Sequence, residues 1–275
     1  MFPIVGTEAI AAGALTRGAL RWNYTVMHPD VYQHKTARKT LYSNTFGAWL
    51  WSGRKGIIAG RAAAALHGAQ WIEDTAPIEM IAKHGRRQPG VVVREERIED
   101  DEVCHVGELL VTTPARTALD LGRHLPRDAA VAHLDALAAA TSVTLSQVRT
   151  LTERYRGARG IPAAREAIAL MDRGARSPRE SALRLLLIDA GLPRPSTAIS
   201  VSDEWWEATL GMGWEEPKVG IDCEESRSGL NAAQDVECHD LFQRAGWFHI
   251  RVLPAQPRTV TLVRVRRALR LRGWR

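Results

Sequence analysis

The chain contains 275 residues, of which 45% are hydrophobic and 25% are charged. A chain of this length is too long to fold around one small hydrophobic core. Its fraction of charged residues is ordinary for a globular protein. Two or three folded domains are therefore expected, and a disordered chain is excluded. Lysine and arginine number 37 against 31 acidic residues, which gives a net charge of +6. This basic balance favours an anionic partner such as nucleic acid.

The three cysteines, Cys104, Cys223 and Cys238, are widely spaced and form no Cys-x-x-Cys pair. Their odd number does not indicate a disulfide framework and agrees with a reducing compartment. The first 13 residues have no basic stretch followed by an apolar run, and no run of 18 apolar residues occurs. We therefore expect a cytoplasmic protein without a signal peptide and without a membrane span.

Residues 1–40 predict a winged-helix-like DNA-binding segment. A helix is expected over residues 7–14, with Thr7 as its N-cap, and a second over residues 16–23, with Thr16 as its N-cap. Pro29-Asp30 predicts a turn between two short apolar strands. Two helices and a hairpin in about 30 residues match a minimal winged helix. A generic small α/β subdomain is the alternative.

Basic side chains in this segment are the predicted contacts to double-stranded DNA. Arg17 and Arg21 lie on the second helix, which takes the place of a recognition helix. Lys35, Arg38 and Lys39 follow the hairpin and add positive charge beside it.

Residues 41–173 predict an α+β middle region. Apolar residues at three- and four-residue spacing indicate helices, and stretches rich in Val and Ile indicate strands. The expected helices span residues 43–51, 60–67, 114–124, 127–140, 142–155 and 161–171, and the expected strands span residues 78–82, 90–94, 102–106 and 109–112. A Gly- and Arg-bearing linker at 172–177 marks the expected domain boundary.

Residues 174–275 alternate helix and strand, which predicts an α/β sandwich. Ser177-Pro178-Arg179-Glu180 is a strong helix start, in which Ser177 caps the helix and Glu180 completes a capping box. The other expected elements are strands at residues 198–201, 209–212, 219–223 and 247–253 and helices at 232–245 and 259–272. The expected class of the whole chain is α/β, or α+β overall.

Seven stretches in a fixed order carry a resemblance to a known family. They are IAGRAAAALHGA (58–69), VTTPARTALDL (111–121), SPRE (177–180), LLL (185–187), GLPRP (191–195), MGW (212–214) and GWFHIRV (246–252). Together they resemble a group of actinobacterial proteins that join an AbiEi-type antitoxin region to a Vsr-like PD-(D/E)XK, or restriction-endonuclease-like, domain. The resemblance covers nearly the whole chain.

The resemblance implies a nuclease-like site in which carboxylates hold one or two Mg²⁺ ions. In the family pattern a Glu stands in the Ser-Pro-x-Glu helix, here Glu180, and an Asp directly precedes Met-Gly-Trp, where this chain has Gly211. The next strand of the pattern carries Glu-x-Asp-Gly followed by a His. Here its acids are Asp222 and Glu224, swapped in identity, and residues 226–229 contain no His.

Three interpretations of Glu180, Asp222 and Glu224 remain open. They can form a live Mg²⁺-dependent endonuclease site, with Asp222 and Glu224 as metal ligands on the same side of a strand. They can instead be a capping Glu and a solvated strand edge. The favoured interpretation is a vestigial catalytic cluster without a cofactor, because Gly211 supplies no oxygen ligand and Glu207 is poorly placed to replace it.

Other features are weaker signals. His239 beside Cys238 is expected to be structural rather than a zinc ligand. Trp205-Trp206 is expected to pack in the core or a hairpin, with stacking on a base or a partner protein as the alternative. Residues 258–275 contain seven arginines and no acid, which indicates either a solvated helix face or part of a basic footprint.

The leading hypothesis is a DNA-binding protein of a toxin–antitoxin or phage-defence type whose nuclease motif is degenerate. A cognate toxin or defence protein is the protein partner that this hypothesis includes. The rivals are an active Mg²⁺-dependent DNA endonuclease and an antitoxin that acts mainly through a partner protein.

Overall fold

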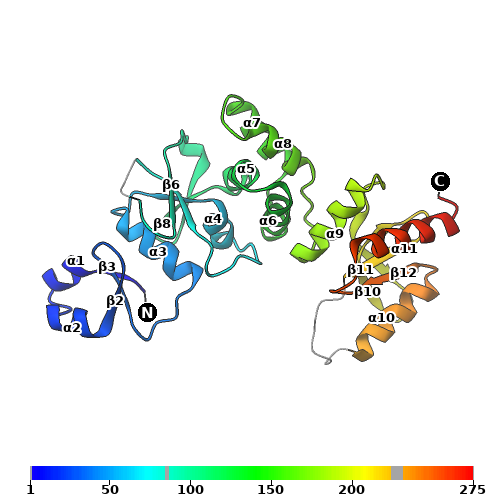
Figure 1. The fold of residues 1–275 in the computed structure, drawn as a ribbon, viewed down its shortest axis with the longest axis horizontal. Helices are drawn as coiled ribbons and strands as arrows, with labels where there is room; N and C mark the ends of the chain where they lie inside the picture. Colours follow the sequence, from blue (N-terminus) through cyan, green and yellow to red (C-terminus); the bar gives the residue numbers. More distant parts are fainter. Residues whose placement is uncertain (1, 84–86, 224–231, 275) are drawn as a thin grey trace. The chain divides into compact units, whose positions relative to one another are not determined.

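The computed structural model describes residues 2–83, 87–223 and 232–274. It contains two compact units, Met1–Met171 and Asp172–Arg275 (Figure 1). Their boundary falls at the start of the linker expected at 172–177. Residues 1–40 belong to the first unit because Val31 shares a core with Leu41 and Trp49. Both units combine helices with sheets, which confirms the expected α/β class.

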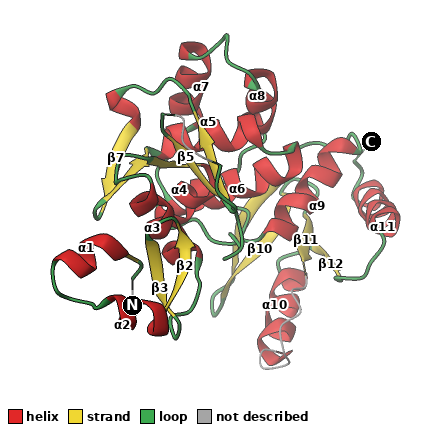
Figure 2. Ribbon diagram, turned by 60° about the vertical axis from the view of Figure 1, so that its left-hand side comes forward, coloured by secondary structure: helices red, strands yellow, loops and turns green. Residues whose placement is uncertain are grey.

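The N-terminal segment is a three-stranded antiparallel sheet with two short helices (Figure 2). The strands, in the sheet order β1-β3-β2, are Ile4–Val5, Val31–His34 and Tyr24–His28, and the helices are α1, Gly6–Ala11, and α2, Arg17–Asn23. Thr16 caps α2 as expected by accepting a hydrogen bond from the N–H of Ala19 at 3.1 Å. The prediction that Thr7 caps α1 is wrong. Its hydroxyl and its N–H both donate to the Asp30 carboxylate, which ties α1 to the hairpin turn.

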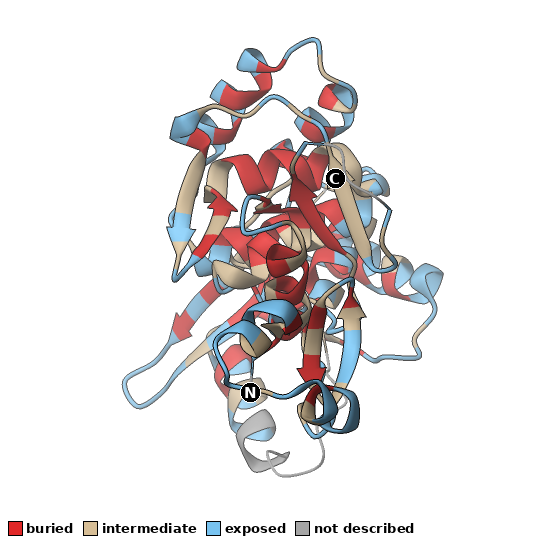
Figure 3. Ribbon diagram, turned by 90° about the vertical axis from the view of Figure 1, so that its left-hand side faces the viewer, coloured by how far each residue is buried: buried red, intermediate tan, exposed pale blue. Residues whose placement is uncertain are grey.

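A five-stranded mixed sheet forms the centre of the first unit, and its inner strands are buried (Figure 3). In sheet order it contains β6 (Val91–Arg94), β5 (Ile78–Ile81), β4 (Ile57–Ala59), β8 (Leu109–Thr112) and β7 (Val103–Val106). Helix α3, Leu41–Trp51, packs against both this sheet and the N-terminal sheet. Strands β1 and β4 were not expected, because two or three residues are too few to show an alternating pattern.

Helix α4, Gly60–Leu66, begins at a carboxylate that a neighbouring strand supplies. Glu79 on β5 accepts a hydrogen bond from the Arg61 N–H at 3.0 Å, and its side chain also lies near the guanidinium groups of Arg61 and Arg94. Gly60 makes this possible because its φ is +57° and because a Cβ there would lie only 1.9 Å from Glu79 Oε2. A negative charge at a helix N-terminus is favourable, so Glu79 fixes where α4 starts.

Four helices complete the first unit: α5 (Pro114–His124), α6 (Arg127–Ala140), α7 (Leu145–Arg154) and α8 (Ile161–Ala169). Helix α5 contacts each of the other three, and most of its residues are buried. Thr113 caps α5 and Thr144 forms a capping box with Gln147 at the start of α7. The bounds of α5 and α6 agree with those expected from their periodicity.

The second unit is a four-stranded mixed sheet with three helices. In sheet order the strands are β12 (Phe248–Val252), β11 (Val219–Cys223), β10 (Glu207–Trp214) and β9 (Ser196–Ser202), and the helices are α9 (Pro178–Asp189), α10 (Ala232–Arg244) and α11 (Arg258–Leu271). Among the strand pairs that the structure describes in this sheet, only β11–β12 is parallel. A parallel pair needs a crossover connection, and α10 supplies it.

Successive side chains of β11 point to opposite faces of the sheet, and each face packs in a different apolar core. Ile221 packs with Leu187 of α9 and Val265 of α11. The preceding Gly220 points the other way and faces Leu210, which belongs to the core that contacts α10. The side chain of Asp222, the residue after Ile221, therefore lies on the same face of the sheet as α10.

We expect the substitution Gly60→Ala to lower the free energy of unfolding by about 2–4 kcal/mol, because the left-handed backbone disfavours an L residue and the new Cβ displaces a buried carboxylate. Gly53→Ala is the matched control: its φ is +68°, but a Cβ there meets nothing within 4 Å. It should cost only about 1–2 kcal/mol. Urea unfolding of the three proteins measures both values, and equal losses would contradict a role for Glu79.

Candidate functional site

The structure brings three of the predicted site positions together in the second unit. Glu180 lies in the first turn of α9, Gly211 lies on β10, and Asp222 lies near the end of β11. A Cβ atom at position 211 would lie 2.8 Å from Asp222 Oδ1 and 3.3 Å from Glu180 Oε1. The two carboxylates therefore converge on the position where the family pattern has an Asp.

Protein donors occupy both oxygens of the Asp222 carboxylate. The backbone N–H of Gly211 donates to Oδ1 at 2.7 Å, and His249 Nε2 lies 2.9 Å from Oδ2. Backbone pairing between β10 and β11 ends at Met212 and Ile221, so the Asp222 side chain replaces the next backbone acceptor. Both oxygens of Asp222 therefore have hydrogen-bonding partners within the protein.

The hydrogen bonds at Asp222 continue through a chain of side chains. His249 Nδ1 lies 3.0 Å from Nδ1 of His239, and His239 Nε2 lies 2.9 Å from Nε2 of Gln243. Gln243 can donate to His239, His239 to His249, and His249 to Asp222, so one set of neutral tautomers satisfies every step. The prediction that His239 is structural agrees with this position.

Arg176 occupies the space beside both carboxylates. Its backbone N–H donates to Glu180 Oε2 at 2.8 Å, and its guanidinium lies 3.4 Å from Glu180 Oε1 and 3.7 Å from Asp222 Oδ1. Ser177 caps α9 as expected, but Glu180 does not complete the predicted capping box, because its carboxylate turns to Arg176. A positive side chain of the protein therefore offsets part of the charge that a divalent cation would neutralise in a nuclease.

The remaining acids of the predicted site are not part of this cluster. Glu224 lies outside the described residues. Glu207 stands at the opposite end of β10 from Trp214, four residues before Gly211, and accepts a hydrogen bond from Ser200. Aspartate at position 211 would bring its Cβ within 3.2 Å of the Ile221 carbonyl oxygen as well as against Asp222. Glycine is therefore the residue that fits the observed arrangement.

The five predicted DNA-contacting residues of the N-terminal segment are all exposed. Arg17 and Arg21 lie four residues apart on α2, and so they share a face of that helix. Lys35 donates a hydrogen bond to the Trp22 carbonyl oxygen, which joins the hairpin to the end of α2. Arg38 is 84% exposed and lies 3.5 Å from Asp74, an ion pair that solvent largely screens.

Trp205 and Trp206 lie at the tip of the hairpin that joins β9 to β10. Their backbone N–H groups both donate to Asp203 Oδ1, and their side chains are 82% and 53% exposed. The expectation was packing in the core or in a hairpin: both residues stand in a hairpin, but their exposed side chains are not part of a core.

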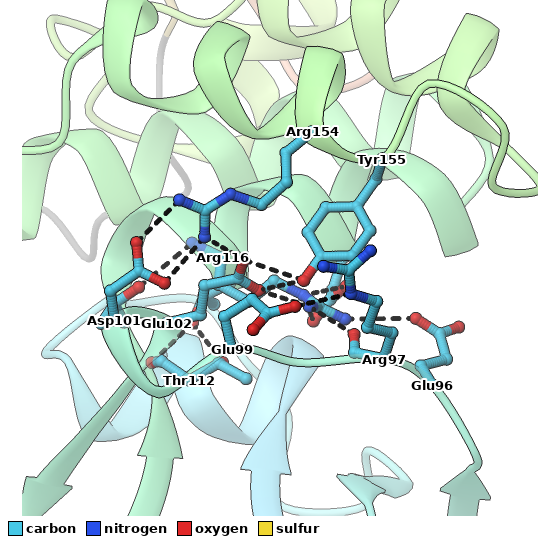
Figure 4. A network of polar contacts seen from close by, with 12 residues as sticks. Glu96, Arg97, Glu99, Asp101, Glu102, Thr112, Arg116, Arg154 and Tyr155 are labelled. Carbon is cyan, nitrogen blue, oxygen red and sulfur yellow. Dashed lines mark hydrogen bonds and ion pairs between the residues drawn. The ribbon is translucent and has the colours of Figure 1, made fainter.

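Sequence reasoning missed a buried polar network in the first unit (Figure 4). Arg116 on α5 is fully buried and pairs with Glu102 at 2.6 Å and with Asp120 at 3.0 Å. The Tyr155 hydroxyl and Arg154 also donate to Glu102, so the network joins α5 and α7 to the residues that precede β7. The available signal was the spacing of residues 116, 120 and 123, which places charge on the buried side of a helix.

One group in this network has the composition of a metal site. A ligand atom from each of Glu96, Asp120 and His124 lies within 4.8 Å of the others. Arg123 and Arg116 already pair with these acids. Burial raises the pKa of Asp120 to about 6 despite the nearby Arg116. Burial also opposes ionisation of Glu96, but contacts with His124 and Arg123 outweigh it and lower its pKa to about 2.

Comparisons with known proteins identify relatives but no family. No family model matches the chain. The uncharacterized protein Rv2248 of Mycobacterium tuberculosis strain H37Rv and the uncharacterized protein MT2308 of strain CDC 1551 are each 33% identical to it over 165 residues. The match covers 59% of this chain, and the chain spans only about three fifths (60%) of the length of each relative.

Within the described parts of the chain, none of the helices combines the length and the apolar character that crossing a bilayer requires.

We expect Arg116→Met to lower the free energy of unfolding by about 3–5 kcal/mol, because it leaves the buried carboxylates of Glu102 and Asp120 without their main cation. Arg149→Gln changes an exposed arginine of α7 and should stay within about 0.5 kcal/mol of the natural protein. Chemical denaturation followed by circular dichroism compares the three. Natural stability in Arg116→Met would show that the network does not hold the first unit together.

Proposed function

We propose that the chain is a DNA-binding protein of a toxin–antitoxin or phage-defence type, and that its nuclease-like second unit binds without cleaving. A cognate toxin or defence protein is the partner that the family resemblance adds to this proposal. Double-stranded DNA is the ligand that the N-terminal segment fits best.

The observation that carries the proposal is the surface of helix α2. Arg17 and Arg21 are exposed on one face of a helix that directly precedes a β-hairpin. This order of elements is that of a recognition helix followed by a wing. Trp22 on the same helix is 74% exposed, and such a large exposed aromatic side chain is typical of a binding surface.

The lack of cleavage rests on the electrostatics of the Asp222 cluster. Mg²⁺ gives up its water reluctantly and needs several oxygen ligands with free lone pairs. Here Gly211 and His249 engage Asp222, and Arg176 stands beside both Asp222 and Glu180. A divalent cation at this place would have to displace an arginine and break existing hydrogen bonds.

DNA affinity should depend steeply on salt, because each phosphate contact releases counterions. The double variant Arg17→Gln, Arg21→Gln should bind a duplex oligonucleotide more weakly. It should also flatten the slope of log K against log salt by about two units, since each contact contributes about 0.9. Fluorescence anisotropy at several salt concentrations measures this slope. The control variant Arg149→Gln, Arg156→Gln removes the same charge from exposed positions and should keep the natural slope. If both variants behave alike, α2 is not a DNA-contacting helix.

A second candidate, a Mg²⁺-dependent DNA endonuclease, is favoured by one observation. Glu180 and Asp222 approach the same point from a helix start and a strand end, as they would around a shared ion. Residue 224, the other acid of the predicted site, lies outside the described residues.

Titration calorimetry with Mg²⁺ and with Mn²⁺ should detect no binding, and plasmid DNA should remain uncut at either metal, because Arg176 and neutral donors already satisfy the carboxylates. Asp222→Asn and the exposed control Asp240→Asn provide the comparison. Cutting by the natural protein that Asp222→Asn abolishes and Asp240→Asn preserves would establish the endonuclease in place of the proposed function.

A further inference from the structure

Positive charge is concentrated at the C-terminal end of the chain. Residues 241–275 contain nine arginines and no acidic residue, so they carry a formal charge of +9, whereas the whole chain carries +6. The other 240 residues therefore carry a formal charge of −3. Within those 240 residues, residues 1–72 carry a net +6 and residues 73–240 a net −9. The acid-free part, residues 241–275, consists mostly of β12 and helix α11.

Helix α11 has one buried face and one exposed face. Val265, Ala268 and Leu269 are buried in the core of the second unit. The opposite face is exposed and carries a shallow depression, which is lined by Val263, Arg266, Arg267, Arg270 and Leu271.

The arginines of α11 divide into two groups by their contacts. Arg264 donates to the Arg251 carbonyl oxygen, and Arg266 donates to that of Ala190. These guanidinium groups anchor the helix on the unit. Among the described residues, by contrast, Arg267 and Arg270 have no hydrogen-bonding or ion-paired partner, although they are three residues apart on the exposed face.

The charge on this face is uncompensated within the helix. Arginines at positions 266 and 270, and at 267 and 270, have the spacing at which like charges on a helix repel one another. No acidic residue occurs in α11, and its first helical residue, Arg258, is a cation at the end of the helix where anions are favoured. This arrangement weakens an isolated helix, and a bound polyanion would reverse the effect.

The chemistry of the face favours nucleic acid over a lipid surface. A helix that lies in a membrane buries its apolar face in the bilayer. Most apolar side chains of α11 are used by the protein core. The outward face also exposes Val263 and Leu271, but its arginines offer planar guanidinium groups that match phosphate oxygens.

We propose that the exposed face of α11, centred on Arg267 and Arg270, binds the phosphate backbone of double-stranded DNA. This inference deepens the proposed DNA-binding function by adding a contact surface separate from α2. Contacts of this kind position a protein on a duplex without reading its sequence.

Four full-length proteins test the inference: the natural protein, Arg267→Gln with Arg270→Gln, Arg17→Gln with Arg21→Gln, and the control Arg149→Gln with Arg156→Gln. Each double variant removes two positive charges from exposed positions, and circular dichroism verifies that each is folded. Affinity for duplexes of unrelated sequence is measured by anisotropy between low and moderate salt. The α11 variant should lose affinity for every duplex to the same degree and should flatten the salt slope by about two units.

The outcomes separate this inference from the proposed function of α2. Loss only in the α2 variant would overturn the inference and leave the proposed function standing. Loss only in the α11 variant would support the inference and remove α2 from the interface. Equal small losses in the α11 variant and in the control would overturn it, because net charge alone would explain them. A last measurement compares binding of the four proteins to vesicles containing phosphatidylglycerol. If the α11 variant loses vesicle binding but keeps DNA binding, the surface binds lipid and the inference fails.

Discussion

In both units, charges that are removed from water are neutralised by groups of the same chain. Transfer of an unpaired charge into a protein interior is costly enough to unfold a domain of ordinary stability. In the first unit, Arg116 meets this requirement with Glu102 and Asp120, and it thereby fixes α5 against the approach to β7. In the second unit, the half-exposed Arg176 lies 3.4 Å from the buried Glu180 carboxylate.

The need to compensate buried charge also distinguishes the Asp222 cluster from the metal site of an active nuclease. In a catalytic carboxylate cluster, the negative charges repel one another until the metal ion binds. The binding free energy of the metal offsets this unfavourable electrostatic energy. In the described cluster, Arg176 already offsets part of that negative charge. The N–H of Gly211, at the position where the family pattern has an Asp, donates a hydrogen bond to Asp222. His249 provides a second donor to the same carboxylate. Groups of the same chain therefore contact both carboxylates.

How much could be predicted from the sequence depended on the range of the interactions involved. Local signals were sufficient for α5, α6, β8 and β11, because caps and apolar periodicity lie within the elements themselves. The approach of Glu180 to Asp222 also followed from the family resemblance. Three features did not follow: the turn of Glu180 toward Arg176, the link from His249 to Asp222, and the exposure of Trp205. The last two depend on how strands pair and where a hairpin ends, which neighbouring residues do not encode. The first is a local choice, because the Arg176 N–H takes the carboxylate that a capping box would have used.

Short elements and buried charge were the other sources of error. Strands β1 and β4 contain two and three residues, so their hydrogen bonds are set by partners elsewhere in the sheet. A buried arginine such as Arg116 resembles any helical arginine in a sequence, and only the companion acid at position 120 distinguishes it. Thr7 shows the same effect at a helix start, because Asp30 of the hairpin turn competes for its hydroxyl.

The acid-free end of the chain also has a consequence for the rate of encounter with a polyanion. Electrostatic attraction between opposite charges extends over roughly 8 Å at physiological ionic strength. A molecule with a net +9 in residues 241–275, +6 in residues 1–72 and −9 between them is turned by such a field before any contact forms. Orientation during approach raises the association rate constant, whereas the dissociation rate constant depends on the close contacts made afterwards. Ionic strength should therefore change how fast this protein reaches a polyanion, in addition to its effect on the phosphate contacts that form afterwards.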